Sequence, residues 1–228
     1  MNSIDYTTDM TSSDAEYFSK EYEKYDNMLD QSPDDILEQF SLHGGVVARK
    51  DQLPIGMIKF MPAGTLYFNE KGDQIIIPAG IKLGKRVQKK ITKILGDHKV
   101  KEILERGGLV VDETYQNQGI GKRMQTKLLQ QSEDKLVYSV TRKEPVKKFY
   151  NNLGHPMHDK DSIRKDVLDM INFAGPLEKE DIVIIHPTLA EIIEKGNEIP
   201  FHKELRFSIL RHNMSQKIDE IIKKIKKK

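Results

Sequence analysis

The sequence predicts an α/β or α+β layered domain, in which helices cover a β-sheet. Two successive strand–helix units support this prediction. In the first, the short apolar run 109–111 leads into a polar turn and a glycine-bearing loop that opens a helix. In the second, the apolar run 136–140 leads into Glu144-Pro145, a typical helix start. Such alternation builds layered folds, and 228 residues favour one domain with elaborations over two.

The N-terminal forty residues are expected to form one short strand and two helices. Residues 4–7 have the composition of a strand, and one of the hydroxyl residues at 11–13 then caps a helix, with Glu16 as its capping partner. Ser32-Pro33 starts a second helix, which runs through Phe40, because proline is favoured at the first helical position.

The middle of the chain is expected to form strands and then a basic helix. The predicted strands are 46–48, 55–61, 65–68 and 74–78, and the last two form a hairpin. One helical face follows, made by Val87, Ile91, Ile94 and Leu95. Val100, Ile103 and Leu104 also recur at helical spacing and indicate a further helical turn.

Beyond His155 the expected elements are a helix at 163–173, a strand at 181–185 and a helix at 189–193. The segment 207–210 is compatible with either type of element. The isoleucines after residue 217 fall on one face of a terminal amphipathic helix.

The segment 108–122 carries the clearest functional signal. Its centre, Gln116-x-x-Gly119-x-Gly121, stands between a buried strand and a helix. Glycine lets backbone approach a ligand closely, and the first N–H groups of a helix point at anions. The segment is therefore a candidate phosphate or pyrophosphate site. It lacks the first glycine of a dinucleotide fingerprint and the spacing of a P-loop, so it is neither of these motifs.

Composition excludes several classes of protein. The chain has no Cys, which excludes disulfides, thiolate zinc sites and Cys nucleophiles. His155, His158 and Asp159 lie close together, but no ligand follows at helical spacing, so we expect loop histidines and no metal. No apolar run approaches the roughly 18 residues that span a bilayer, and the N-terminus does not read as a signal peptide. These features predict a soluble, cytoplasmic protein that makes no membrane contact.

Charge is distributed unevenly, although the net charge is only +2. The first forty residues are strongly acidic, whereas Asp97 is the only acidic residue in the basic block 82–101, and the chain ends in a lysine-rich tail. Such blocks bind anions or nucleic acid, or they form solvated helix faces. Both interpretations stay open, and the first makes nucleic acid a candidate partner.

The segments 109–121 and 146–154 together resemble the GNAT superfamily of acyl-CoA-dependent N-acetyltransferases. That family carries L-x-V-x-P-x-[YF]-[QR]-x-x-G-[IV]-G followed by A-x-x-F-Y-x-x-L-G-F, and both patterns occur here in the right order. The resemblance covers about residues 4–154. It implies a mixed, mostly antiparallel central sheet flanked by helices. It also implies acetyl-CoA as acyl donor and an amine as acceptor.

The resemblance further implies a role for particular residues. The pyrophosphate of coenzyme A would bind the loop made by Gln116, Asn117, Gln118, Gly119, Ile120, Gly121 and Lys122. The backbone of Leu109, Val110 and Val111 would pair with the pantetheine arm and polarise the thioester carbonyl. Tyr150 matches the general acid that protonates the departing thiolate. Either Glu105 or Glu113 is the candidate general base, and no enzyme nucleophile is needed.

Several positions depart from the family pattern. Lys143, Val146 and His155 stand where Asn, Ala and Phe are common, and Glu113 replaces Pro. Residues 62–106 are longer than the usual connection and read as a basic insertion. The predicted organisation is thus a catalytic domain at 1–187, with this insertion, and a basic helical extension at 188–228.

The predicted function is transfer of an acetyl group from acetyl-CoA to a primary amine by direct attack in a ternary complex. Three alternatives remain open: transfer of a different acyl chain, a catalytically inactive GNAT-like binding or regulatory module, and nucleic-acid binding through the basic segments. The acceptor is a small molecule or a protein, and a homodimer is possible.

Overall fold

The structure is a computed structural model that describes residues 3–24, 31–132, 135–174, 176–199 and 201. These residues form two compact units. The first unit comprises residues up to 62, together with 103–162 and 179–190. The second comprises 63–102, 163–178 and the residues from 191 onward. The expected segment 207–210 and the terminal helix lie outside the described residues, and the predicted domain boundaries at 187 and 188 remain predictions.

The first unit begins with strand β1 (Asp5–Thr7), helices α1 (Ser12–Tyr22) and α2 (Pro33–His43), and strand β2 (Gly45–Lys50). Both helices start with a capping box, in which the N-cap hydroxyl and the carboxylate three residues later satisfy each other's backbone N–H. Thr11 caps α1 and Ser32 caps α2, as predicted. The expected partner Glu16 is wrong, because Asp14 occupies the third helical position, where the side chain reaches back to the cap.

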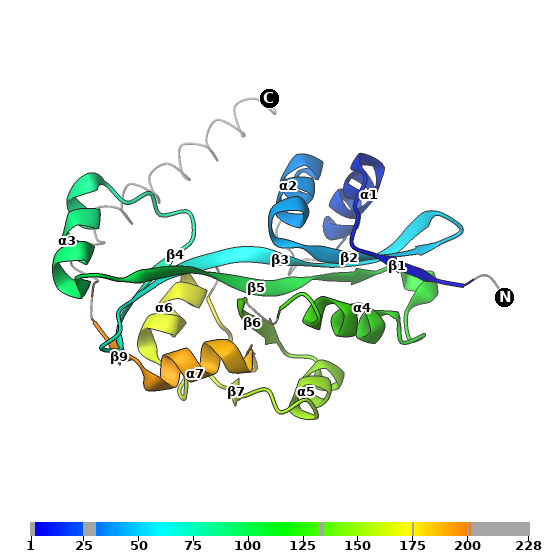
Figure 1. The fold of residues 1–228 in the computed structure, drawn as a ribbon. Helices are drawn as coiled ribbons and strands as arrows, with labels where there is room; N and C mark the ends of the chain where they lie inside the picture. The colour runs from blue at the N-terminus through cyan, green and yellow to red at the C-terminus, as the bar shows by residue number, and fades with distance from the viewer. Residues whose placement is uncertain (1–2, 25–30, 133–134, 175, 200, 202–228) are drawn as a thin grey trace, which may run out of the picture. The chain divides into compact units, whose positions relative to one another are not determined.

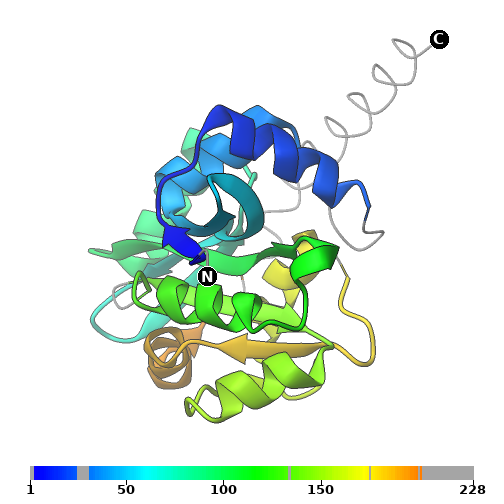
Figure 2. The same cartoon turned by 90° about the vertical axis from the view of Figure 1, so that its right-hand side faces the viewer.

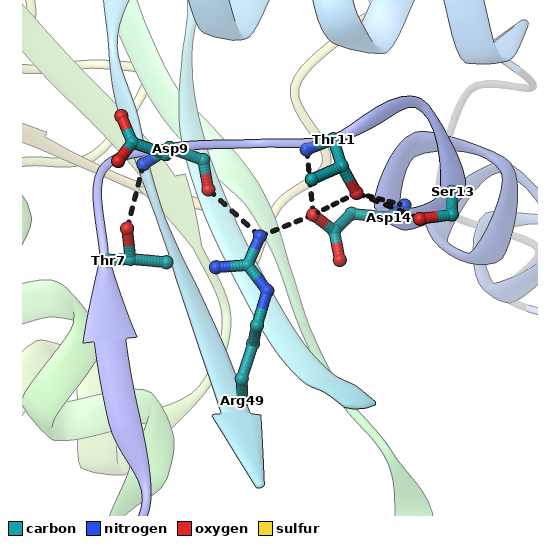
Figure 3. Close-up of polar contacts among 6 residues, drawn as sticks. All are labelled: Thr7, Asp9, Thr11, Ser13, Asp14 and Arg49. Carbon is teal, nitrogen blue, oxygen red and sulfur yellow. Dashed lines mark hydrogen bonds and ion pairs between the residues drawn. The ribbon is translucent and has the colours of Figure 1, made fainter. Parts of the chain in front are cut away.

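An arginine at the end of β2 ties α1 to the sheet. Arg49 donates hydrogen bonds to the backbone oxygen of Asp9, 3.0 Å away, and to the carboxylate of Asp14. Figure 3 shows this cluster, in which the same carboxylate also accepts from Thr11. Only 4% of the Asp14 side chain and 13% of the Arg49 side chain are exposed, so the ion pair is largely shielded from water.

The sheet of the first unit is mixed and mostly antiparallel. Strand β1 pairs antiparallel with β2, and β2 pairs antiparallel with β3 (Leu53–Phe68). Next to β3 runs β5 (Lys99–Val111), in the opposite direction, because Ile55 meets Asp112 while Met61 meets Gly107. Beyond β5 come β6 (Leu136–Thr141), β8 (Ile182–Ile185) and β7 (Met157–His158); β5 and β6 are parallel, and the other two pairings are antiparallel.

The predicted helical turn at residues 100–104 is wrong, because these residues belong to the 13-residue strand β5. Ile103 and Leu104 are both buried. Adjacent strand residues point to opposite faces of a sheet. A strand that is covered on both faces therefore buries consecutive residues. Together with Val100, the buried pair Ile103 and Leu104 has the i, i+3, i+4 spacing of a helix face, although all three residues lie in a strand.

Helices cover both faces of this sheet, as Figures 1 and 2 show. On one face, α1 and α2 pack through Phe18, Ile36 and Phe40 onto strand residues such as Met57 and Val110. On the other face, α4 (Ile120–Leu129) packs through Met124 and its neighbours onto strand residues such as Phe60 and Val137. Helix α5 (Glu144–Asn151) packs against β8.

The second unit has its own apolar core. The predicted hairpin is confirmed, since residues 64–68 of β3 pair antiparallel with β4 (Asp73–Pro78), which in turn pairs parallel with β9 (Asn197–Glu198). Helix α3 (Lys85–Leu95) packs onto β4 through Ile91 and Leu95, while its lysines face outward. Helix α6 (Lys165–Ala174) also packs against β4. Helix α7 (Pro187–Lys195) contributes residues to both units.

No helix within the described part of the chain is both long enough and apolar enough to cross a membrane.

Candidate active site

The centre of the site is the point where the two parallel strands of the first unit stop pairing. Residues 103–105 of β5 pair with 136–138 of β6, and the last pair is Glu105 with Tyr138. Beyond it β5 continues through Val111, while β6 pairs with β8 on its other edge. Within the described residues, no strand pairs with the β6-facing edge of 106–111. Its backbone N–H and C=O groups can therefore bind an extended ligand.

Glycine shapes β5 just beyond this point. Gly108 has a φ of +63°, which side-chain-bearing residues rarely adopt. A Cβ at Gly108 would also lie 2.4 Å from the hydroxyl oxygen of Tyr22. That hydroxyl donates a hydrogen bond to the carbonyl oxygen of Gly108, 3.1 Å away. Helix α1 thus fixes the backbone of β5 where the strands separate.

The glycine loop ends in an uncapped helix. After a short 3₁₀ helix at Glu113–Tyr115, the chain passes through exposed residues at 116–119 and enters α4 at Ile120. Gly119 is the N-cap residue, in the left-handed conformation with a φ of +75°, and no side chain caps the helix. The first N–H groups of α4 thus lack a side-chain acceptor, and the helix dipole adds partial positive charge there. Lys122 is exposed in the first turn.

Tyr150 lies on α5 and is buried, with 1% of its surface exposed. Its ring meets Phe149 edge-to-face, with the centroids 4.8 Å apart. Burial raises the pKa of the Tyr150 phenol to about 12, although the nearby Arg106 guanidinium opposes the shift. The phenol is therefore protonated at neutral pH, as a proton donor must be.

Arg106 was not predicted as a site residue, and its charge acts on Tyr150. Its guanidinium carbon lies 4.0 Å from the centroid of the Tyr150 ring, and the residue is 3% exposed. Its Nε donates to Ser139 Oγ, 3.0 Å away, and Ser139 Oγ donates to the Arg106 backbone oxygen over the same distance. Its two terminal nitrogens, Nη1 and Nη2, have no hydrogen-bond partner among the described residues.

Two histidines complete the surroundings of Tyr150. The ring of His155 lies 5.3 Å from the Tyr150 ring and 5.2 Å from the His186 ring, measured between centroids. Burial, together with the nearby Arg106 and His186, lowers the pKa of His155 to about 4, so its ring is neutral at pH 7. Burial and Arg106 also lower the pKa of His186. The described residues contain no cluster of three ligands for a metal ion.

Glu105 lies on the opposite face of β5 from Arg106, because neighbouring strand residues alternate. Burial raises its pKa, although the Tyr138 hydroxyl, 3.5 Å from its carboxylate, and the Lys59 ammonium favour the charged form. Lys59 is fully buried on β3 and donates to the side chain of Gln39 on α2. Burial lowers the pKa of Lys59 to about 8.

Glu113 lies apart from this group. It is the exposed first residue of the 3₁₀ helix. Its negative charge helps to raise the pKa of the Lys24 ammonium. Of the two predicted bases, only Glu105 is enclosed beside the end of strand pairing. Glu105, the open strand edge, the loop and Tyr150 all belong to the first unit.

The chain matches one family model. A family model described as the acetyltransferase (GNAT) family matches residues 8–155. A search of curated proteins returned no match.

Similar solved structures include three with known ligands. The protein yncA of Salmonella typhimurium, solved with its cofactor acetyl-CoA, is 9% identical with a TM-score of 0.46, and the match covers 81% of this chain and 92% of that one. NAA60 of Arabidopsis thaliana, in complex with a bisubstrate analogue, is 13% identical with a TM-score of 0.45, covering 81% and 97%. N-acetylglutamate synthase of Neisseria gonorrhoeae, complexed with coenzyme A and N-acetyl-glutamate, is 9% identical with a TM-score of 0.48, covering 82% and 35%.

Because the family model spans more than half of the chain, the protein belongs to the GNAT family of acetyltransferases.

Proposed function

We propose that this GNAT-family acetyltransferase transfers an acetyl group from acetyl-CoA to a primary amine by direct attack in a ternary complex. One observation carries the proposal: the open edge of β5, the uncapped start of α4 and the buried phenol of Tyr150 belong to one compact unit. These are the three features that an acyl-CoA thioester needs for binding and cleavage.

Coenzyme A would bind along β5 and at the start of α4. The backbone N–H groups of the loop 116–121 would hold the pyrophosphate, since an uncapped helix start favours anions. Lys122 adds a positive charge there. The backbone of 109–111 would pair with the amides of the pantetheine arm, because this strand edge is open. The fit is supported by Gly119, which has no Cβ at the N-cap and has open space where a Cβ would stand.

The chain would supply a base and an acid on the two faces of β5. Glu105 would take the ammonium proton, and its raised pKa suits a base that works near neutral pH. The amine nitrogen then bonds to the carbonyl carbon while the carbon–sulfur bond breaks. Tyr150 would give its phenolic proton to the sulfur. Glu113 remains a weaker candidate base, because it is exposed.

The acceptor amine would approach from the face of α1 and α2, where Glu105, Lys59 and Tyr138 lie. Its identity stays open, and so does the length of the acyl chain. The predicted domain at 1–187, the basic insertion at 62–106 and the extension at 188–228 remain part of the proposal. An inactive GNAT-like binding module is the alternative if binding is found without turnover.

A thermal-shift titration with acetyl-CoA tests the proposal. We expect the melting temperature to rise with acetyl-CoA concentration, because a ligand that binds only the folded state stabilises it. Gly119→Asp should abolish the rise, since its carboxylate repels the phosphates. Gly84→Asp is the matched control: Gly84 is also a helix N-cap with no atom within 4 Å of an added Cβ, but it belongs to α3. Its acetyl-CoA shift should equal that of the wild type.

A nucleic-acid function is favoured by the exposed lysines of the block 82–101, such as Lys85, Lys89 and Lys93. If acetyl-CoA at millimolar concentration leaves the melting temperature unchanged, the acetyltransferase proposal fails. A salt-dependent mobility shift with DNA or RNA would then support the alternative, because phosphate contacts weaken as salt rises.

A further inference from the structure

No anion among the described residues compensates the buried guanidinium of Arg106. Its Nε is held by Ser139, but Nη1 and Nη2 have no hydrogen-bond partner among the residues that the structure describes. Among the described residues, the groups whose pKa the Arg106 charge shifts are Tyr150, His155 and His186. None of these carries a negative charge at neutral pH. An unpaired charge inside a protein is costly, so it usually marks a place where a ligand supplies the opposite charge.

The position of the guanidinium indicates what that ligand is. Arg106 is the first residue of β5 beyond the last pair with β6, on the face that carries Ser139 and Tyr150. The ring of Tyr150 covers one flat side of the guanidinium, and the N–H groups of the terminal nitrogens lie in its plane, so they donate toward the edge. In the proposed reaction, Tyr150 protonates the sulfur of coenzyme A, so the sulfur comes within reach of the same guanidinium.

We propose that Arg106 is a catalytic residue that binds the departing thiolate of coenzyme A through Nη1 and Nη2. The inference rests on the proposed acetyl transfer. As the carbon–sulfur bond breaks, its electron pair moves to sulfur, and the new negative charge meets the guanidinium. The phenolic proton of Tyr150 then moves to sulfur, which leaves a free thiol. The new amide nitrogen loses its second proton to water, the tyrosinate takes a proton back from water, and Glu105 releases to water the proton that it took from the ammonium.

This arrangement lets the thiolate leave before it is protonated. A thiol ordinarily has a pKa of about 8.5. Burial raises the pKa of Tyr150 to about 12 even with Arg106 beside it, so complete transfer of the phenolic proton to the thiolate is uphill. A fixed positive charge beside both groups stabilises the thiolate before protonation and the tyrosinate after it. Charge-assisted hydrogen bonds of this type are among the stronger ones in proteins.

The test compares the binding of coenzyme A with that of acetyl-CoA. Only coenzyme A has an ionisable thiol, so the ratio of the two dissociation constants reports the ionisation of that thiol. Titration of Tyr150, His155 or His186 affects the binding of both ligands and therefore cancels in the ratio. Calorimetry between pH 6 and pH 9 with the full chain gives this ratio. We expect coenzyme A to gain affinity relative to acetyl-CoA as pH rises, by about tenfold for each unit by which the bound thiol pKa is lowered.

Arg106→Met should remove this gain, because the positive charge is lost. Arg106→Lys should keep part of it, since the ammonium retains the charge without the two-nitrogen fork. Ser139→Ala leaves the charge but frees Nε, and it is the variant of choice if Arg106→Met fails to fold. Arg142→Lys is the matched control: Arg142 directly follows β6 and pairs with Asp181, so the wild-type ratio should persist.

The outcomes separate this inference from the proposed function. If the wild type binds neither ligand, the proposed function fails. If it binds both but the ratio does not change with pH, or if Arg106→Met keeps the wild-type ratio, the thiolate role is overturned while acetyl-CoA binding stands. If Arg106→Met weakens both ligands equally at every pH, Arg106 only supports the fold of the site.

Discussion

The guanidinium of Arg106 stacks on the ring of Tyr150, with the guanidinium carbon 4.0 Å from the ring centroid. The arginine comes from the central strand and the tyrosine from α5, so the contact joins two elements that are distant in the sequence. It places a permanent positive charge beside the phenol that the family pattern identifies as the general acid. The chemistry proposed for this site depends on both residues.

Removal of the Tyr150 hydroxyl should slow acetyl transfer without unfolding the protein. Tyr150→Phe retains the ring that packs against Phe149 and Arg106. We expect turnover to fall by about 10²-fold, the lower range for a lost general acid. Affinity for acetyl-CoA should stay within a few-fold of the wild type. Release of free thiol from acetyl-CoA, with hydroxylamine as the acceptor amine, measures turnover.

The control for that experiment is Tyr6→Phe, which also removes a buried phenol hydroxyl from the first unit. Its turnover should match the wild type. Equal turnover for Tyr150→Phe and the wild type would remove Tyr150 from the mechanism and leave the thiolate to be protonated by water.

The pH profile of turnover should distinguish Glu105 from Glu113 as the base. A base acts when deprotonated, so the rate rises with pH through its pKa. Burial raises the pKa of Glu105, so the rise should be centred above the usual range for glutamate. Glu105→Gln should lower turnover and abolish this limb, whereas Glu113→Gln should leave it unchanged. The reverse pattern would assign the base to Glu113.

Local patterns in the sequence predicted much of the fold, because helix caps and glycine loops depend on neighbouring residues. Ser32-Pro33 and Gly119 are examples, and the structure has both at helix starts. The environments of Arg106 and Lys59 were not predictable in this way. Each of these environments depends on which strands lie side by side. The register of β5 against β6, for example, pairs residues that are far apart in the sequence. For the same reason, the sequence predicts a helical turn at residues 100–104, where the structure has the strand β5.

Lys59 should reduce stability at neutral pH. Burial lowers its folded pKa to about 8, below the value of about 10.4 in an unfolded chain. A lowered folded pKa means that the penalty is absent above the unfolded pKa and is fully present once pH falls below the folded one. Lys59→Met should therefore raise the free energy of unfolding at pH 7 by roughly 2–3 kcal/mol, from the size of this shift. The gain should disappear near pH 10.5.

Urea unfolding of both proteins at pH 7 and near pH 10.5 measures this difference. Lys89→Met, at an exposed position of α3, is the control and should change the free energy of unfolding little at either pH. A Lys59→Met variant that is less stable than the wild type at pH 7 would contradict the prediction. It would mean that the hydrogen bond to Gln39 outweighs the cost of the buried charge.

The ion pair between Arg49 and Asp14 should stabilise the first unit above pH 4. Burial raises the pKa of Asp14, but hydrogen bonds from Arg49 and Thr11 and the charge of Arg49 outweigh it, so the net pKa is lowered. A lowered folded pKa in an acid gives stability that is present above the unfolded pKa and is lost as pH falls through the folded one. Arg49→Met should cost about 3 kcal/mol at pH 7, as for other broken buried pairs.

This cost should shrink below pH 4, where Asp14 takes up a proton and no longer needs a cation. Urea unfolding at pH 7 and pH 3 tests the change, with Arg123→Met at an exposed position of α4 as the control. An equal cost at both pH values would mean that Arg49 contributes through packing of its side chain and not through its charge.

The two glycines of the loop should differ in their tolerance of alanine. Gly119 has a φ of +75°, so Gly119→Ala forces a left-handed residue and should cost about 1 kcal/mol, although no atom lies within 4 Å of the new Cβ. Gly121 lacks a positive φ, and a Cβ there would meet Leu109 and Val111 at 3.6–3.9 Å, which is ordinary contact. Thermal melts should therefore show a loss for Gly119→Ala and little change for Gly121→Ala.

Melts repeated with acetyl-CoA separate stability from binding. If the loop holds the pyrophosphate, Gly119→Ala should also reduce the ligand-induced rise, because the strained N-cap redirects the first N–H groups of α4. Gly121→Ala should reduce the rise only if backbone must approach the ligand more closely than a methyl group allows. Loss of the rise in Gly121→Ala alone would move the closest phosphate contact from the N-cap to the first turn of the helix.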